Sequence, residues 1–362
     1  MKLLFFEPPP SQRAGGLDRA IRSLEHFLRT SGVTVHCNPS KEMFERADDS
    51  KLVHFHGLWQ PNFPRVSAKC RRLRIPYVVS PHGMVEPWAW RHKWWKKRIY
   101  FQLVERRHVA GAARLVATSE TEASNLKQFF PGSRCDVLPL GIAEARGPGY
   151  EDARRTLGWK SSELVLLFLS RIHPKKGLDL LIKSLAYLKE VARDRDARLV
   201  IVGDGDDSYV GRLRRLAAKK LGTNLPVTWT GGIWDDRKWA YLQGADLMCL
   251  PSHSENFGLV ILEALQVGTP VLTTDQTPWS ALPGLGGGWI VRPDVEPLTE
   301  ALAEFFKGPR WTTEQRTRLA ADVQSQFSWE KVGPAYIRFY EDILRDARQD
   351  GRDRTWNTTG KT

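Results

Sequence analysis

The sequence of 362 residues has only four cysteines and lacks any long hydrophobic run. The cysteines are scattered, without the paired spacing that a disulfide framework or a zinc site requires, so we expect a reduced protein. No stretch reaches the roughly 18 consecutive apolar residues of a membrane-spanning helix. The N-terminal run KLLFF ends at Glu7 and three prolines, too early for a secretory signal peptide. These absences predict a cytoplasmic protein without membrane spans.

Acidic residues are in deficit, since 41 Asp and Glu face 54 Lys and Arg and leave a net charge of +13. Such an excess favours anionic partners, which include nucleic acid, a membrane surface and phosphorylated small molecules. The length exceeds that of one ordinary hydrophobic core and predicts two domains.

Short apolar runs alternate with amphipathic stretches along the chain, which is typical of βα units around parallel sheets. The first set of expected strands covers residues 2–6, 33–37, 51–56, 77–80, 114–119 and 135–139. The second set covers residues 163–171, 197–205, 225–231, 245–252, 269–275 and 288–291. We therefore expect an α/β fold of two Rossmann-like domains facing a cleft, with ligands bound outside the carboxyl ends of the strands.

The composition also suggests where the domains begin and end. We expect an N-terminal domain at 1–145, a Gly-rich and charged linker at 146–162, and a C-terminal domain at 163–329. A helix at 330–347 is expected to pack back toward the N-terminal domain. The polar tail at 348–362 is expected to be disordered.

A carboxylate stands inside an otherwise apolar helix pattern near the end of the chain. In the stretch PSHSENFGLVILEALQVGTPV, 251–271, only Glu263 and Gln266 interrupt the helix that begins near Gly258. An ionised carboxylate is costly to bury without donors, and a ligand rich in hydroxyl groups supplies them. Glu255 precedes the helix start, which attracts phosphate. The alternative is that Glu263 pairs with a buried arginine and that Glu255 is a surface residue.

Two cations follow the strand at 163–171. In SRIHPKKG, 170–177, Arg171 ends the strand, and a proline-containing turn leads to Lys176. Fixed cations at the carboxyl end of a strand suit the two phosphates of a nucleotide diphosphate and can neutralise a leaving group without a metal. The alternative is a solvated basic turn.

Taken together, SRIHPKKG, PSHSENFGLVILEA and GTPV resemble the retaining glycosyltransferases of family four, which have the two-domain GT-B fold. The resemblance covers residues 1–345. It implies that Glu255 faces the donor sugar and that Glu263 accepts hydrogen bonds from ribose hydroxyls. It also implies that Arg171 and Lys176 hold the diphosphate.

The same resemblance implies further donor contacts in both domains. The backbone of Phe257, Gly258 and Leu259 would line the pocket for sugar and phosphate, and the loop at Gly231 would lie against the base. In the N-terminal domain the pair Gly15–Gly16, at the start of the first helix, would close over the donor.

Histidines follow two expected strands of the N-terminal domain. His82, in YVVSPHGM, occupies the position of a histidine that contacts donor sugar and phosphate in similar enzymes, although a strand-end histidine is often only structural. In HFHGLW, 54–59, His54 and His56 lie on the same side of a strand end. A metal site would need a third ligand there, so we expect no metal and assign His56 and Trp59 to acceptor contact.

The segment PWAWRHKWWKKRIYFQLVERRHV, 87–109, mixes tryptophans with cations. From residue 88 onward it holds seven Lys or Arg against one Glu. This composition suits an interface with anionic lipid, where we place Trp94, Trp95, Lys96 and Lys97. Single-stranded nucleic acid would suit it too, and a core helix with a solvated basic face is the remaining alternative.

The sequence thus predicts a metal-independent retaining hexosyltransferase without a cofactor, whose donor is a UDP- or GDP-sugar. Catalysis is assigned to His82, Arg171, Lys176 and Glu255. Similar bacterial enzymes with SPHGM, a basic Trp-rich helix and TPWS build capsule, exopolysaccharide or lipopolysaccharide. That similarity implies a lipid-linked saccharide acceptor and a peripheral position on the inner face of the cytoplasmic membrane. The alternatives are a GT-B-fold epimerase or hydrolase acting on nucleotide sugars, and a basic nucleic-acid-binding protein.

Overall fold

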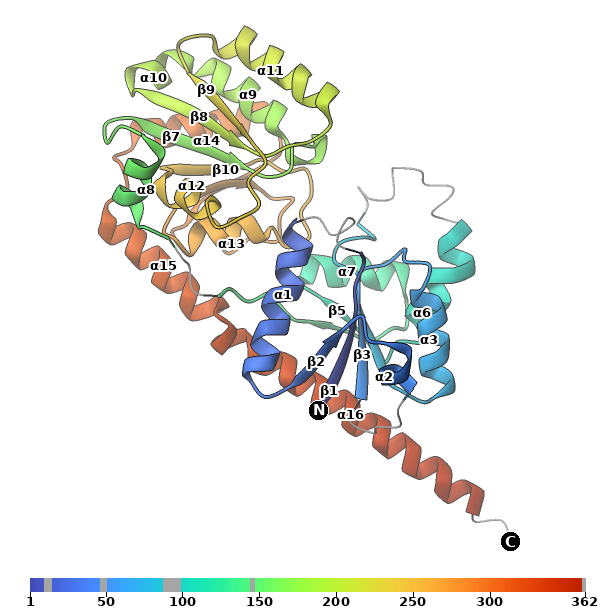
Figure 1. The fold of residues 1–362 in the computed structure, drawn as a ribbon. Coiled ribbons are helices and arrows are strands. Elements are labelled where there is room, and N and C mark those ends of the chain that lie inside the picture. The colour runs from blue at the N-terminus through green and yellow to red at the C-terminus, as the bar shows by residue number, and fades with distance from the viewer. Residues whose placement is uncertain (10–14, 46–50, 87–98, 144–146, 360–362) are drawn as a thin grey trace. The chain divides into compact units, whose positions relative to one another are not determined.

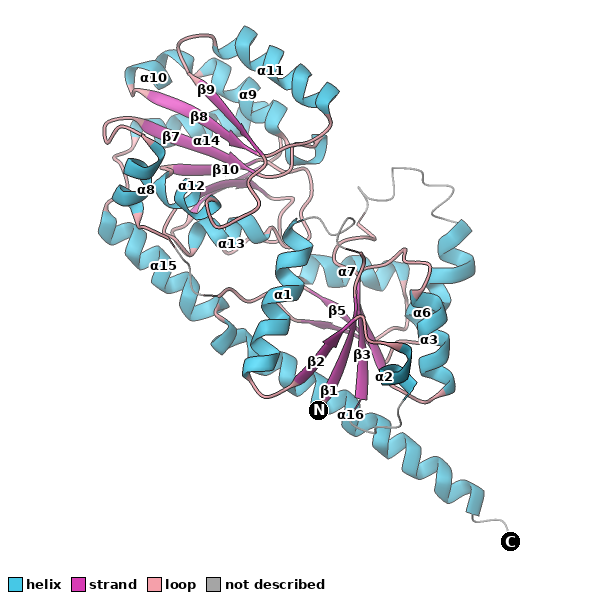
Figure 2. Cartoon of the chain, in the orientation of Figure 1, coloured by secondary structure: helices cyan, strands magenta, loops and turns pink. Residues whose placement is uncertain are grey.

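The computed structural model describes residues 1–9, 15–45, 51–86, 99–143 and 147–359. The chain divides into two compact units. The N-terminal unit comprises Met1–Gly141 and Phe327–Thr362, and the C-terminal unit comprises Ile142–Gln326. Figure 2 shows a sheet with helices on both faces in each unit.

The N-terminal unit is built on a parallel six-stranded sheet with the order β2-β1-β3-β4-β5-β6. Its strands are β1 (Lys2–Phe6), β2 (Thr34–Cys37), β3 (Lys51–His56), β4 (Tyr77–Ser80), β5 (Arg114–Ala117) and β6 (Cys135–Val137). Its helices are α1 (Gly15–Thr30), α2 (Lys41–Glu45), α3 (Phe63–Arg72), the π-helix η2 (Phe101–Glu105), α6 (Arg106–Ala110), α7 (Glu120–Phe129) and α16 (Trp329–Thr359).

Two hydrophobic layers cover the two faces of this sheet, because successive side chains of a strand point to opposite sides. Leu3 and Phe5 of β1 pack into the layer that contains α1 and the buried face of α16. Leu4 and Phe6 pack into the opposite layer, with Phe101. In Figure 1, α16 runs beside α1 and the strands of this unit. The C-terminal helix is therefore part of the N-terminal core.

The C-terminal unit repeats the pattern with a parallel sheet of order β12-β11-β10-β7-β8-β9. Its strands are β7 (Leu164–Leu169), β8 (Ala197–Val202), β9 (Val227–Gly231), β10 (Leu247–Leu250), β11 (Val271–Thr274) and β12 (Gly288–Val291). Its helices are α8 (Tyr150–Leu157), the 3₁₀ turn η3 (Pro174–Lys176), α9 (Leu178–Tyr187), α10 (Lys189–Asp194), α11 (Asp207–Leu221), α12 (Lys238–Gly244), α13 (Leu259–Leu265), α14 (Val295–Lys307) and α15 (Thr313–Phe327). The predicted α/β fold with two parallel sheets is confirmed.

Two segments differ from the sequence-based expectation. The tail at 348–362 was expected to be disordered, but α16 continues to Thr359. Between Pro334 and Thr359 the sequence contains no proline, and its five Arg residues are good helix formers. The expected linker at 146–162 contains α8, whose Arg154 is fully buried.

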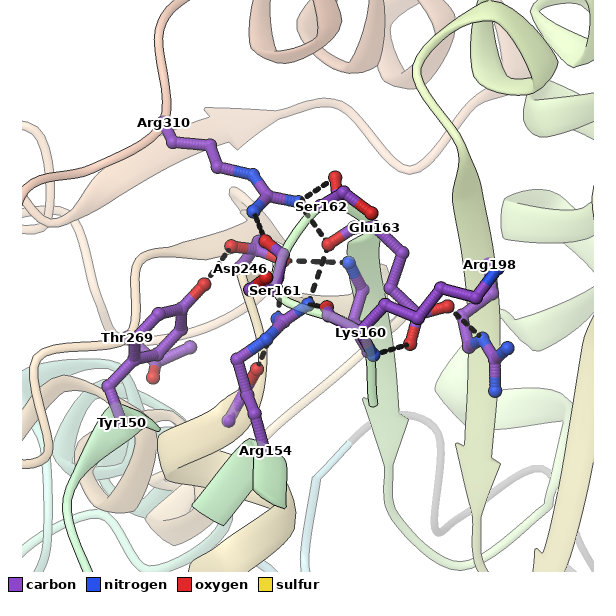
Figure 3. Close-up of polar contacts among 12 residues, drawn as sticks. Tyr150, Arg154, Lys160, Ser161, Ser162, Glu163, Arg198, Asp246, Thr269 and Arg310 are labelled. Carbon is purple, nitrogen blue, oxygen red and sulfur yellow. Dashed lines mark hydrogen bonds and ion pairs between the residues drawn. The ribbon is translucent and has the colours of Figure 1, made fainter. Parts of the chain in front are cut away.

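Arg154 explains why this segment belongs to the C-terminal unit (Figure 3). Its guanidinium donates to the Gly244 carbonyl at 2.9 Å, to the Asp246 carboxylate at 3.0 Å and to the Glu163 carbonyl at 2.7 Å. Asp246 also accepts from the Tyr150 hydroxyl at 2.8 Å. Because a buried guanidinium needs such partners, α8 is tied to the start of β7 and to β10 rather than forming a free linker.

No helix within the described ranges combines the length and apolar composition needed to cross a membrane.

Candidate functional site

The strand order of the C-terminal unit places two loops side by side. From β7 the chain proceeds outward to β8 and β9, and then returns to the other side of β7 with β10, β11 and β12. The order therefore reverses between β7 and β10, which are paired parallel neighbours. Open α/β sheets bind ligands outside the carboxyl ends of their strands at such a reversal. The loop with Arg171 and Lys176 follows β7, and the loop with Glu255 follows β10.

Lys176 and Glu255 meet directly at this reversal. The Lys176 ammonium donates to Glu255 Oε1 at 2.5 Å, and the Ser252 hydroxyl donates to the same oxygen at 2.7 Å. Burial raises the pKa of the Glu255 carboxyl, but the Lys176 charge and these hydrogen bonds outweigh burial and leave the pKa below its ordinary value. Glu255 is therefore an ionised carboxylate held by a cation.

Close backbone packing keeps the two loops together. Gly177 has φ +68°, and a Cβ there would lie 2.0 Å from the Pro251 carbonyl oxygen, so only glycine fits. The His253 N–H donates to the Lys175 carbonyl at 2.7 Å. Arg171 precedes this turn and is exposed. The predicted cation pair and the predicted Glu255 thus lie on adjoining loops.

Glu263 lies on α13 with its side chain buried. Its Oε1 is 2.7 Å from the ammonium of Lys238, the first residue of α12, and both side chains are at most 5% exposed. Lys238 also lies over the Trp239 ring, 4.2 Å from its centroid. The partner is a lysine rather than the arginine considered from the sequence. This ion pair gives Glu263 a structural role, and contact with a ribose stays a prediction.

The other predicted donor contacts lie at loop positions around the same edge. Gly258 is the N-cap of α13 in the left-handed conformation, with Leu259 as the first helical residue. The Phe257 carbonyl accepts a hydrogen bond from Trp279 Nε1 at 2.6 Å, which anchors this turn. Gly231 ends β9, which is separated from β10 by the two strands β7 and β8.

A second reversal occurs in the N-terminal unit, between β1 and β3. Gly15 and Gly16, the first residues of α1, come after β1. His56 ends β3, and His82 follows β4, the next strand of the sheet. The predicted residues of this unit therefore lie at the carboxyl ends of three adjacent strands.

Three histidines form a stack at this edge. The rings of His54 and His56 are 4.0 Å apart, and His56 Nδ1 lies 3.1 Å from His82 Nε2. His54 contacts the Tyr340 hydroxyl at 2.9 Å and the Ser80 hydroxyl at 2.7 Å. Burial lowers the pKa of all three rings, that of His82 to about 4, so they are neutral near pH 7.

The burial of these residues affects their predicted roles. His56 is only 1% exposed, which argues against direct contact with an acceptor and favours a role in supporting His82. His82 itself is partly exposed and has φ +51°, a left-handed conformation that is uncommon for residues other than glycine. Trp59, with φ +66°, is partly exposed and packs against Tyr100 and Phe101.

Two buried glutamates near these histidines were not expected from the sequence. Glu105 accepts a hydrogen bond from the Trp59 N–H at 2.8 Å, and burial raises its pKa to about 7. Glu122 accepts from the Gly83 N–H at 2.7 Å and from the Thr118 N–H at 2.8 Å. Burial raises the pKa of Glu122, and these hydrogen bonds oppose the rise. The sequence signal for Glu122 was the pattern Ser119-x-x-Glu122, which resembles a capping box.

Trp94, Trp95, Lys96 and Lys97 lie outside the described residues. The neighbouring Ile99 and Leu103 are 55% and 67% exposed, which is unusual for large apolar side chains. Arg106 and Arg107, one turn further, are exposed as well. Within the described part of the chain, no group of three or more His, Cys, Asp or Glu side chains is arranged to hold a metal ion.

Known families match both units of the chain. Residues 7–141 match the family described as glycosyl transferase 4-like domain, and residues 150–325 match the family described as glycosyl transferases group 1. The two matches cover every strand of the two sheets except β1, and nearly all the site residues discussed above. The chain belongs to the glycosyltransferases of family four, which have the GT-B fold.

Individual relatives agree with this assignment. The D-inositol 3-phosphate glycosyltransferase of Segniliparus rotundus is 32% identical over 259 residues, which are 66% of this chain and 54% of that protein. This chain thus spans little more than half the length of that curated relative.

Solved structures share the fold across nearly the whole chain. Sucrose-phosphate synthase from Thermosynechococcus elongatus has a TM-score of 0.76 at 19% identity, covering 96% of this chain and 100% of its own. Anabaena HepE, solved in complex with UDP, has a TM-score of 0.69 at 19% identity, covering 98% and 100%.

Proposed function

We propose that this protein transfers a hexose from a UDP- or GDP-sugar to a saccharide acceptor, with retention of the anomeric configuration and without a metal. The observation that carries the proposal is the ion pair between Lys176 and Glu255 at the reversal point of the C-terminal sheet. A cation and a carboxylate on adjoining loops match the two chemical parts of such a donor, its diphosphate and its sugar hydroxyls.

The pair suggests how the donor is taken up. A diphosphate at the turn 170–177 would accept hydrogen bonds from Lys176 and from the exposed Arg171. Lys176 would then share its charge with the phosphate, and Glu255 would gain hydroxyl donors from the sugar in return. Both groups stay paired, so the binding of a charged donor leaves no buried charge uncompensated.

The same cations support the chemical step. Negative charge builds up on the diphosphate as the bond to the sugar breaks, and fixed cations stabilise that charge. Retention follows from the resemblance to family four, in which the leaving phosphate helps to deprotonate the acceptor on the same face of the sugar. His82, neutral and partly exposed, would contribute a hydrogen bond to the donor.

We further propose that the acceptor is a lipid-linked saccharide and that the protein works on the inner face of the cytoplasmic membrane, in the synthesis of a bacterial surface polysaccharide. Exposed Ile99 and Leu103 beside exposed Arg106 and Arg107 support this proposal. Apolar side chains next to cations suit the boundary between water and anionic lipid.

The test is donor consumption in the presence of EDTA, with UDP- and GDP-hexoses offered one at a time. Release of the nucleotide diphosphate that depends on an added saccharide acceptor supports the transferase, and NMR of the product gives the anomeric configuration. An inverted product would contradict retention. Formation of free sugar or an isomerised donor without acceptor would favour a hydrolase or an epimerase instead.

A further inference from the structure

The turn that carries His82 has an unusual backbone. His82 has φ +51° and Gly83 has φ +73°, so two consecutive residues are left-handed. A non-glycine residue seldom adopts this conformation unless surrounding contacts impose it. The His82 ring meets His56 on one side, through Nε2. That contact orients the ring but does not hold the backbone of the turn.

The Met84 N–H donates to the Pro81 carbonyl at 3.2 Å and closes the turn. Glu122 adds a buried side-chain contact to the backbone of the same turn. Its Oε1 accepts a hydrogen bond from the Gly83 N–H at 2.7 Å. Its Oε2 accepts from the N–H and the hydroxyl of Thr118, at 2.8 and 2.9 Å. The Glu122 side chain is buried and reaches from the first turn of α7 to the loop after β4. One carboxylate therefore joins the carboxyl ends of β4 and β5.

This use of the carboxylate differs from ordinary helix capping. Ser119 is the N-cap of α7, and its hydroxyl accepts from the Glu122 N–H at 3.2 Å. In a capping box the glutamate three residues after the N-cap reaches back to the N-cap N–H. Here the carboxylate of Glu122 reaches outside the helix, to Thr118 and Gly83. A role in capping alone would not require the contact with Gly83.

We propose that Glu122 is a positioning residue, which holds the His82–Gly83 turn in its left-handed conformation and thereby presents the His82 imidazole to the sugar nucleotide. The inference rests on the proposed function, because it assumes that His82 contacts the donor. It adds that the contact depends on the buried carboxylate of Glu122 on α7.

The geometry offers a selective substitution. In Glu122→Gln the amide oxygen is expected to take the Oε2 place, where two donors converge. The amide NH₂ would then face the Gly83 N–H, so the link to the turn is lost while both links to Thr118 remain. Thr118→Val is the matched control, because it removes one hydrogen bond to the same carboxylate and leaves the Gly83 contact intact.

The experiment is a double-mutant cycle that measures kcat/KM for acceptor-dependent release of UDP or GDP from the sugar nucleotide. We expect Glu122→Gln to lower kcat/KM about tenfold to a hundredfold, and Thr118→Val to lower it by less than about threefold. In the His82→Ala background, Glu122→Gln should cause less than about a threefold further loss, because it acts through His82. Equal losses in both backgrounds would overturn the proposal.

Two further results separate the possible failures. If His82→Ala leaves kcat/KM unchanged, the role of His82 in the proposed function fails, and the inference fails with it. If Glu122→Gln does not fold, amide hydrogen exchange of the unmodified protein decides. The Gly83 N–H should be protected like the amides of β4, and exchange as fast as in an exposed loop would overturn the proposal.

Discussion

Glu263→Gln separates a ligand-binding role of Glu263 from a structural one. The carboxylate lies 2.7 Å from the Lys238 ammonium, and both side chains are at most 5% exposed. Removing one partner of a buried pair costs about 3–5 kcal/mol of unfolding free energy. Because the glutamine oxygen can still accept a hydrogen bond from Lys238, we expect a loss near the lower end, about 3 kcal/mol.

The affinity for a nucleotide tests the ligand-binding role of Glu263. If Glu263 accepts hydrogen bonds from ribose hydroxyls, replacing the charged acceptor with the neutral glutamine oxygen should cost about 1–1.5 kcal/mol of binding free energy, which is about 5- to 13-fold in Kd. Isothermal titration calorimetry with UDP and GDP, at a temperature where the variant is fully folded, measures this change directly.

Lys238→Met is the control for this prediction. It breaks the same ion pair but leaves the Glu263 carboxylate in place, so it should lower stability to a similar extent while nucleotide affinity falls much less. Unchanged nucleotide affinity in Glu263→Gln would refute the ribose contact and leave Glu263 as the structural partner of Lys238. Equal losses of affinity in the two variants would show that binding depends only on the intact pair.

Three further predictions concern stability and location. Arg154→Met should lower the free energy of unfolding of the C-terminal unit by about 3 kcal/mol in urea titrations, because it removes the cation 3.0 Å from the buried Asp246 carboxylate and leaves Arg316, at 3.6 Å, beside it; a loss below about 1 kcal/mol would contradict the anchoring role. His82 has a pKa of about 4, against an ordinary value of 6.5, so the unfolded chain binds more protons between these values. The contribution of His82 to the stability of the N-terminal unit should therefore fall as the pH is lowered from about 6.5 to 4, and His82→Phe should remove that contribution in pH-dependent unfolding. Replacing Trp94, Trp95, Lys96 and Lys97 with serine should abolish sedimentation with anionic vesicles while sparing nucleotide binding; vesicle binding that survives would place the membrane contact elsewhere.

Local patterns were sufficient to predict the sheets. The runs at 2–6 and 77–80 became β1 and β4 with the predicted bounds, because a strand buried on both faces is a largely apolar run bounded by turns. The motif SRIHPKKG could be placed for the same reason, since it directly follows the run that became β7.

The partners of the buried charged side chains could not be predicted from such local patterns. Glu263 pairs with Lys238, which lies 25 residues earlier on another helix, and only the packing of α12 against α13 brings the two together. Arg154 lies in a charged, Gly-rich segment with the composition of a linker. Its burial depends on Asp246, far along the chain, so neither composition nor periodicity could predict it.

The account as a whole depends on a nucleotide diphosphate binding at the loops after β7 and β10. The most direct test is thermal stabilisation of the full chain by UDP, GDP and ADP in the presence of EDTA, compared with the Arg171→Ala/Lys176→Ala double variant. The account predicts a rise in Tm with one of these nucleotides that persists in EDTA and disappears in the variant. No rise with any of them, or an equal rise in the variant, would contradict it.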